Sequence, residues 1–231
     1  MSETILVTGA SAGFGQAICR RLVADGYRVI GSARRIEKLQ VLQEELGEGF
    51  YPLQMDVTDL SQVDHALASL PADWDQIDVL VNNAGLALGL APAYEAEVSD
   101  WLTMVQRNDG YIINLGSTAG TVPYPGANIY GASKAFVKQF SLNLRADLAG
   151  KKIRVSNIEP GLCEGTEFSS VRFKGDEKRV EALYKDAHAI QPEDIANTVA
   201  WLLQQPKHVN INRIEIMPVS QSFGPQPVYR D

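Results

Sequence analysis

Tyr130 and Lys134 are the first pair of side chains in this sequence whose types and spacing could do chemistry. Residues four positions apart lie on the same face of a helix, so a helix here would place the phenol beside the ammonium. A neighbouring positive charge favours the phenolate, and we therefore expect Lys134 to lower the pKa of Tyr130 from about 10 toward neutral pH. A tyrosine tuned in this way can pass a proton to or from a substrate oxygen, which is general acid–base catalysis.

Ser117 directly follows an apolar segment, residues 111–116, and could hydrogen-bond the same substrate oxygen. A Tyr-x-x-x-Lys pair alone is most often a coincidence of an amphipathic helix, and an isolated serine is most often a turn residue. The order of the three residues gives them weight, because they follow a glycine-rich turn of the kind that binds nucleotides.

That glycine-rich turn lies between an apolar run and a helical pattern near the start of the chain. Glycine permits a positive φ and the close backbone approach that a pyrophosphate requires. The first turn of the following helix offers free N–H groups and a positive dipole end to the same anion. Although many glycine-rich turns are only turns, the strand before and the helix after predict a phosphate cradle. Its residues are Gly9, Ala10, Ser11, Ala12, Gly13, Phe14 and Gly15.

Arg34 and Arg35 stand at the end of the second apolar run, the position that selects the nucleotide. An NAD site usually has a carboxylate there that holds the ribose hydroxyls, and this chain has none. Two guanidinium groups suit a 2′-phosphate, which they bind through charge-assisted hydrogen bonds. The alternative is a solvated charged face shared with Glu37 and Lys38. The missing acid and the present bases together favour NADP over NAD.

Apolar strand-like runs alternate with helical patterns along the whole chain, and these elements must position the residues above. The expected strands cover 4–8, 27–32, 50–55, 78–82, 111–116, 153–159 and 214–217. The expected helices cover 13–24, 36–46, a segment capped by Thr58 that reaches Leu70, 130–148, and a segment from Pro192 that ends before Pro206. Strands that are apolar throughout and separated by single helices predict a parallel sheet covered on both faces. The expected fold is a doubly wound, Rossmann-type α/β domain of about seven strands that spans residues 1–231.

Composition excludes several other classes. The formal net charge is −7 and the sequence pI is about 5.0, which argues against nucleic acid or an anionic membrane as the main partner. Cys19 and Cys163 form no CxxC motif, so neither a disulfide framework nor a metal site is expected. The first residues lack a basic region and a long apolar core, so a signal peptide is not expected and a cytoplasmic setting is the default.

In combination, these motifs resemble the short-chain dehydrogenase/reductase family. The matching pieces span nearly the whole chain and are highly specific together: TGASAGFG at 8–15, NNAG at 82–85, Ser117, the YxxxK at 130–134 and Pro160-Gly161. The sequences of residues 165–176 and 208–219 are similar to those of bacterial family members that act on small 3-hydroxy acids.

The resemblance implies a role for each matching residue. Tyr130 would be the catalytic acid/base, Lys134 would lower its pKa and hold the nicotinamide ribose, and Ser117 would position the substrate oxygen. The segment 160–168 would close over the nicotinamide, and the rest of that loop would be a substrate lid. The residues that would contact NADP are Gly9, Ala10, Ser11, Gly13, Phe14 and Gly15 at the pyrophosphate, Arg34 and Arg35 at the 2′-phosphate, Asp56 and Val57 beside the adenine, Asn83 from the fourth strand, and Pro160, Gly161 and Thr166.

The resemblance also implies the substrate. The enzyme would oxidise the 3-hydroxyl of L-allo-threonine, L-serine or 3-hydroxypropionate, or reduce a matching semialdehyde such as malonic semialdehyde. Arg172 could clamp the carboxylate with two hydrogen bonds, or it could be a surface charge on a mobile loop. Two alternatives stay open: a broader carbonyl or 3-ketoacyl reductase of the same family, and a non-catalytic NADP-binding sensor. The family habit implies a homotetramer.

One departure from the family pattern lies between the fourth and fifth strands, at residues 86–110. Only 25 residues are present there, enough for one short helix at about 99–106. The family has about five more helical turns, which carry a proton-relay Asn and a helix at a dimer interface, and Asn108 does not match that Asn. Either the protein is genuinely shorter or the printed sequence omits a segment. We favour the second, because losing an outer helix would uncover an apolar sheet face.

Overall fold

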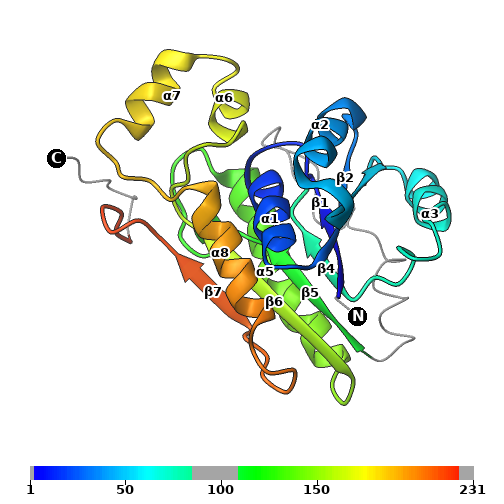
Figure 1. The fold of residues 1–231 in the computed structure, drawn as a ribbon. Coiled ribbons are helices and arrows are strands. Elements are labelled where there is room, and N and C mark those ends of the chain that lie inside the picture. The colour runs from blue at the N-terminus through cyan, green and yellow to red at the C-terminus, as the bar shows by residue number, and fades with distance from the viewer. Residues whose placement is uncertain (1–2, 85–108, 224–231) are drawn as a thin grey trace.

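The computed structural model describes residues 3–84 and 109–223 (Figure 1). Strands and helices alternate through the described chain, as expected. The strands are β1 (Thr4–Thr8), β2 (Arg28–Ala33), β3 (Phe50–Gln54), β4 (Val79–Asn82), β5 (Asp109–Leu115), β6 (Lys152–Pro160) and β7 (Arg213–Ile216). The helices are α1 (Gly13–Ala24), α2 (Ile36–Leu46), α3 (Leu60–Ala68), α5 (Asn128–Asp147), α6 (Phe168–Arg172), α7 (Glu177–Tyr184) and α8 (Pro192–Leu203), with short 3₁₀ turns η1 (Gly47–Gly49) and η3 (Thr118–Gly120).

The seven strands form one sheet in the order β3-β2-β1-β4-β5-β6-β7, and every described pairing is parallel. The chain first builds outward from β1 to β3 and then returns to place β4 against the other side of β1. The strand order therefore reverses between β1 and β4, and all carboxyl ends lie along one edge. Ligands of such sheets bind at that edge, beside the reversal.

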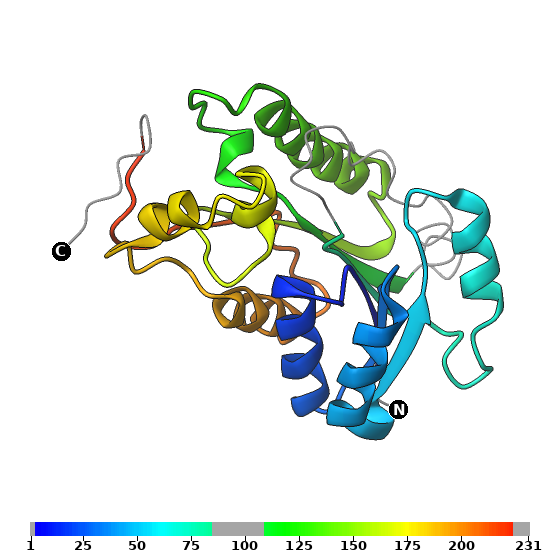
Figure 2. The ribbon, with the colours of Figure 1, turned by 90° about the horizontal axis from the view of Figure 1, so that it is seen from above.

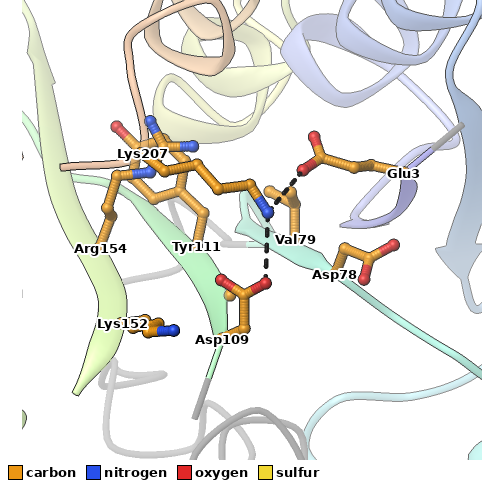
Figure 3. A pocket seen from close by; sticks show the side chains of 9 residues that line it. Glu3, Asp78, Val79, Asp109, Tyr111, Lys152, Arg154 and Lys207 are labelled. Atoms are coloured by element: carbon orange, nitrogen blue, oxygen red, sulfur yellow. Dashed lines mark hydrogen bonds and ion pairs between the residues drawn. The ribbon is translucent and has the colours of Figure 1, made fainter. Parts of the chain in front are cut away.

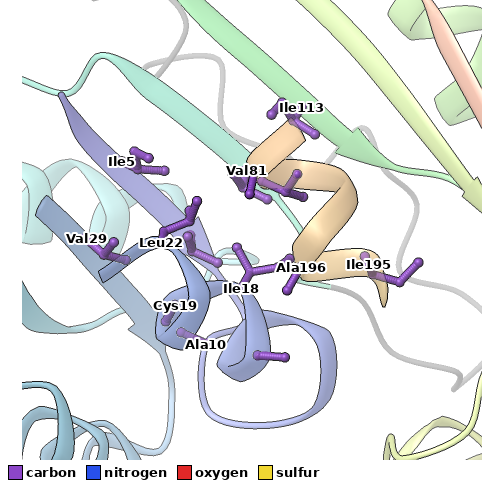
Figure 4. Close-up of a cluster of buried hydrophobic side chains, with 14 of the residues drawn as sticks. Ile5, Ala10, Ile18, Cys19, Leu22, Val29, Val81, Ile113, Ile195 and Ala196 are labelled. Carbon is purple, nitrogen blue, oxygen red and sulfur yellow. The ribbon is translucent and has the colours of Figure 1, made fainter. Parts of the chain in front are cut away.

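Helices cover both faces of the sheet. Seen from above, α1, α2 and α8 lie on one side and α3 and α5 on the other (Figure 2). The buried side chains divide in the same way, because successive residues of a strand point to opposite faces. Ile5 and Val7 of β1 belong to the cluster that includes Ile18 and Leu22 of α1, part of which Figure 4 shows. Leu6 belongs to the cluster under α3 and α5.

Local signals set the helix boundaries. Gly47 follows α2 with φ +67°, the left-handed region that glycine adopts without strain. Pro192 occupies the first turn of α8, and Gln191 and Asp194 form a reciprocal capping box there. The carboxylate of Asp59 accepts the backbone N–H groups of Ser61 and Gln62 and so caps α3.

The expected doubly wound α/β fold is confirmed, with seven strands whose ends shift by no more than two residues. The N-cap of α3 was predicted wrongly: it is Asp59, because Thr58 is engaged in a turn with the carboxylate of Asp56. Helices α6 and α7 lie where only a loop was expected. The expected helix at 99–106, Asn108 and most of the crossover 86–110 lie outside the described residues.

Among the described helices, none is long and apolar enough to cross a membrane. Cys19 and Cys163 are both free thiols, and burial raises the pKa of each, that of Cys163 to about 12. Neither thiol is therefore activated as a nucleophile.

Candidate active site

The turn after β1 forms a cradle in which Gly9 and Gly15 have no room for a side chain. Gly9 has φ +69°, and a Cβ on Gly15 would lie 2.3 Å from the carbonyl oxygen of Gly9. Ala12 precedes α1 without a side-chain cap, and the first turn of α1 carries no acidic residue. The backbone N–H groups of that turn are therefore available to an anion, which fits a pyrophosphate at the helix N-terminus.

Asn83 and Thr8 tie this cradle to β4. The amide nitrogen of Asn83 donates to the carbonyl oxygens of Thr8 at 2.9 Å and Gly9 at 3.3 Å. The hydroxyl of Thr8 accepts the backbone N–H groups of Asn83 at 3.1 Å and Ala84 at 2.9 Å. Sequence reasoning gave Asn83 only a cofactor contact and did not single out Thr8, since bonds between residues about 75 positions apart leave no local signal.

The two arginines after β2 have different surroundings. The guanidinium of Arg35 donates to the hydroxyl of Ser11 at 3.0 and 3.3 Å, which places it at the mouth of the cradle. Arg34 is exposed, and its backbone carbonyl accepts the amide of Gln54. Half-buried Asp56 and Val57 follow β3 at the same sheet edge. The structure thus brings Arg35 to the phosphate cradle and leaves Arg34 facing solvent.

Ser117, Tyr130 and Lys134 meet at the carboxyl ends of β5 and β6. The Ser117 hydroxyl accepts the N–H of Ala119 at 3.1 Å and lies 3.4 Å from the carbonyl oxygen of Pro160. Tyr130 and Lys134 share one face of α5, and the Lys134 amine lies 5.9 Å from the centre of the Tyr130 ring. The amine donates to the carbonyl oxygen of Leu115 at 2.8 Å, so a strand end fixes its position.

The electrostatics of this trio differ from the expectation. Burial raises the pKa of Tyr130 to about 12, although a hydrogen bond with Ser117 and the charge of Arg172 act in the opposite direction. Burial also lowers the pKa of Lys134 to about 8. The pKa of Tyr130 in the protein alone is therefore shifted away from neutral pH, because desolvation is the largest effect on this phenol. The expected phenolate needs a further positive charge in the site.

The segment after β6 folds over this trio. The ring of Phe168 in α6 packs on Tyr130 with centroids 5.3 Å apart, and the guanidinium of Arg172 lies 5.3 Å from the ring of Tyr124. A Cβ on Gly13 would lie 3.1 Å from Thr166, so this segment also contacts the cradle. Phe168 was expected only as the end of the closing segment 160–168, and Tyr124 was not singled out in the sequence.

Gly161 is the first residue of the same segment after β6. Its N–H donates to Ile216 at 2.7 Å, and a Cβ there would meet the side chain of Gln221 at 2.3 Å. The expected contact segment 160–168 therefore starts from a fixed position at the end of β6.

A small hollow lies at the amino-terminal edge of the sheet, opposite the edge that carries the residues described above (Figure 3). Its volume is about 20 Å³, room for a single water molecule. Lys207 pairs there with Asp109 at 3.2 Å and Glu3 at 3.7 Å, while Arg154 stacks on the Tyr111 ring at 3.9 Å. These charges are engaged with one another, so the hollow is a structural clamp and the carboxyl edge holds the candidate site.

Taken together, the carboxyl edge offers an anion cradle, a guanidinium beside it and a phenol with an amine and a hydroxyl nearby. Such a set can bind a dinucleotide and exchange a proton with a substrate oxygen. The short chain dehydrogenase family model matches residues 3–108 and 102–177. The chain belongs to the short-chain dehydrogenases, an oxidoreductase family that acts on hydroxyl groups.

Particular relatives narrow the comparison. A probable NADP-dependent dehydrogenase of Haemophilus influenzae is 55% identical over 249 residues, covering 100% of this chain and 99% of the relative. An NADP-dependent 3-hydroxy acid dehydrogenase of Salmonella typhi is 54% identical over 245 residues, with 98% and 99% covered. The solved closed form of serine dehydrogenase complexed with NADP+ has a TM-score of 0.88 and 52% identity, covering 99% of this chain and 100% of that one.

The aligned lengths bear on the short crossover. The alignment with the Haemophilus protein runs over 249 positions, whereas this chain has 231 residues, so at least 18 aligned positions have no residue here. The expected difference of about five helical turns between β4 and β5 is of that size.

The shifted pKa of Lys134 predicts a pH effect on stability. Its pKa falls from 10.5 in the unfolded chain to about 8 in the folded protein, so between these values the unfolded state binds more protons and stability rises with pH. Relative to Lys134→Met, the free energy of unfolding of the wild type should therefore rise by roughly 1–2 kcal/mol from pH 7 to 9.5. Urea denaturation at both pH values measures this difference, and an unchanged or falling difference would show that the amine is not desolvated.

Proposed function

We propose that the protein is an NADP-dependent dehydrogenase of small 3-hydroxy acids, with Tyr130 as the catalytic acid/base. The observation that carries this proposal is the meeting of Tyr130, Lys134 and Ser117 at the sheet edge that also bears the phosphate cradle. The names of the Salmonella relative and of the serine dehydrogenase structure support the same substrate class and cofactor.

The residues at the cradle would hold NADP in the way that the sequence predicts. Gly9, Ala10, Ser11, Gly13, Phe14 and Gly15 would approach the pyrophosphate, Arg35 with Arg34 would meet the 2′-phosphate, Asp56 and Val57 would border the adenine, Asn83 would contact the cofactor from the end of β4, and Pro160, Gly161 and Thr166 would border the nicotinamide. When bound, NADP+ accepts the hydride and adds a positive charge beside the phenol.

Tyr130 would act at its phenolic oxygen. In the oxidation direction, the phenolate removes the proton of the substrate hydroxyl while the C–H bond breaks as hydride, which leaves a carbonyl. Ser117 hydrogen-bonds the reacting oxygen, and the ammonium of Lys134 stabilises the phenolate. With a pKa of about 12 in the protein alone, Tyr130 is protonated at neutral pH. This form donates a proton to a carbonyl, so the same site serves the reduction of a semialdehyde.

Arg172 would bind the substrate carboxylate. It is exposed at the end of α6, and its charge acts on Tyr130 in the direction that favours the phenolate, although burial raises the pKa of that phenol overall. A carboxylate held by Arg172 would thus place a 3-hydroxyl carbon close to Tyr130. L-Serine, L-allo-threonine and 3-hydroxypropionate have this arrangement, whereas a bulky uncharged ketone does not.

The homotetramer and the cytoplasmic setting stay predictions that follow from the family habit and from the composition. The alternatives, a broader carbonyl or 3-ketoacyl reductase and a non-catalytic NADP-binding sensor, are separated from the proposal by the measurements below.

The first test is activity. With NADP+, absorbance at 340 nm should rise with L-serine, L-allo-threonine or 3-hydroxypropionate, and Tyr130→Phe should lower kcat by about 10²-fold or more because the proton acceptor is lost. Tyr111→Phe, which alters a buried phenol away from the site, is the matched control. Activity with bulky ketones alone would support the broader reductase, and no activity with either class would support the sensor.

The second test concerns the cofactor. Arg35→Ala should raise the KM for NADP+ by about 10-fold or more and leave the KM for NAD+ nearly unchanged, because only NADP+ carries the 2′-phosphate that the guanidinium would bind. Arg34→Ala, at the exposed neighbour, should have the smaller effect. Equal changes for both cofactors in Arg35→Ala would contradict the assignment.

The third test concerns the carboxylate. Arg172→Met keeps an unbranched apolar stem but removes the charged guanidinium, and it should raise the KM for L-serine by about 10-fold or more while sparing a small uncharged alcohol. Lys174→Met, on the same loop, is the control for a general loss of positive charge. If both substrates are affected alike, Arg172 does not bind the carboxylate.

A further inference from the structure

Glu167 occupies the anion-binding side of Arg35. Its two carboxylate oxygens accept hydrogen bonds from the terminal nitrogens of Arg35 at 3.1 and 3.2 Å, a two-pronged arrangement. The amine of Lys38 donates to the same carboxylate at 3.3 Å. The two cations lie about 130 positions from Glu167 in the sequence, and the carboxylate joins them across the cleft.

The hydrogen-bonding capacity of Arg35 is then largely used. Its Nε and one terminal nitrogen also donate to Ser11, so Ser11 and Glu167 together engage all three nitrogens of the guanidinium. A 2′-phosphate that binds Arg35 end-on with two hydrogen bonds uses the same two terminal nitrogens, whereas side-on binding would use the nitrogens that donate to Ser11. In the end-on arrangement, the phosphate takes the place of the Glu167 carboxylate.

Glu167 is also joined directly to the segment that covers the catalytic trio. It immediately precedes α6, whose Phe168 packs on Tyr130 at 5.3 Å. The preceding residue, Thr166, lies against Gly13 of the cradle. The cleft between α2 and this segment measures about 680 Å³ and is lined by both Glu167 and Lys38. A movement of Glu167 would therefore also move the adjacent residue Phe168, which packs on Tyr130.

We infer that Glu167 is a specificity-determining residue that competes with the 2′-phosphate for Arg35, so that a 2′-phosphorylated nucleotide detaches residue 167 and the start of α6 from α2. A nucleotide without the 2′-phosphate leaves the Arg35–Glu167 pair intact. The inference deepens the proposed function, because it rests on Arg35 as the 2′-phosphate ligand.

The balance of charges makes this exchange favourable. Glu167 and Arg35 keep 53% and 40% of their side-chain surface exposed, so their ion pair is weak and easily replaced. A phosphate monoester carries a charge of about −1.5 to −2 at neutral pH and offers three acceptor oxygens, whereas the carboxylate offers −1 and two. The phosphate therefore displaces the carboxylate of Glu167 from Arg35. Because this displacement has a cost, the competition lowers the apparent affinity of the protein for the 2′-phosphorylated nucleotide.

Calorimetric titration with 2′,5′-ADP and with 5′-AMP tests the competition without any turnover. Glu167→Gln should bind 2′,5′-ADP about three- to tenfold more tightly than the wild type and bind 5′-AMP equally. Glu37→Gln removes the same charge from the same cleft and is the matched control, since Glu37 has no described contact with Arg35. Unchanged affinity in Glu167→Gln, or an equal gain in Glu37→Gln, would overturn the inference.

Hydrogen–deuterium exchange tests the detachment. In the wild type, 2′,5′-ADP should increase backbone exchange in residues 166–172, and 5′-AMP should not. In Glu167→Gln, exchange of this segment should already be high, and 2′,5′-ADP should add little. Decreased or unchanged exchange on adding 2′,5′-ADP to the wild type would overturn the inference.

The outcomes separate this inference from the proposed function. If the wild type binds 2′,5′-ADP no better than 5′-AMP, or if Arg35→Ala keeps the preference, the proposed 2′-phosphate site fails and the inference fails with it. If the preference exists and is lost in Arg35→Ala, but Glu167→Gln behaves as the wild type, only the competition is wrong.

Discussion

The contact between the turn after β1 and the end of β4 is the constraint on which the rest of the site depends. Thr8 and Asn83 exchange hydrogen bonds across the point where the strand order reverses, and Gly9 and Gly15 meet there more closely than any side chain would allow. Because β4 is also hydrogen-bonded to β5, this contact joins the cradle to the strand that leads into Ser117. The cradle that could bind an anion and the strand that positions Ser117 are thereby connected along one edge of the sheet.

Desolvation is the second organising effect. It raises the pKa of the Tyr130 phenol and lowers the pKa of the Lys134 amine, so both groups are driven toward their neutral forms when the protein is alone. A positive charge entering such a site acts at low dielectric and therefore shifts these equilibria more than it would in water. In the proposed function, the site acquires its basic phenolate only after an oxidised cofactor has arrived.

Much of this arrangement could be predicted from the sequence, because local spacing encodes it. The glycines of the cradle, the four-residue step from Tyr130 to Lys134 and the apolar strands are short-range patterns, and the sheet follows from their alternation. Helix α7 was missed because it is short and charged and buries no residue fully, so its apolar positions Val180, Leu183 and Tyr184 give only a weak signal. The pair between Arg35 and Glu167 depends on how distant segments meet, and the pKa of Tyr130 depends on how deeply it is covered, so neither has a local signature.

The charged side chains at the two edges of the sheet have different kinds of partners. At the amino-terminal edge, the buried guanidinium of Arg154 donates to the backbone carbonyls of Leu202 and Gln205 and stacks on the ring of Tyr111. Arg154 thereby connects the end of α8 to β5 and β6. A lysine there would keep the charge but could not stack a planar guanidinium on Tyr111. These contacts are all made within the chain, so the amino-terminal rim does not depend on a ligand for its shape.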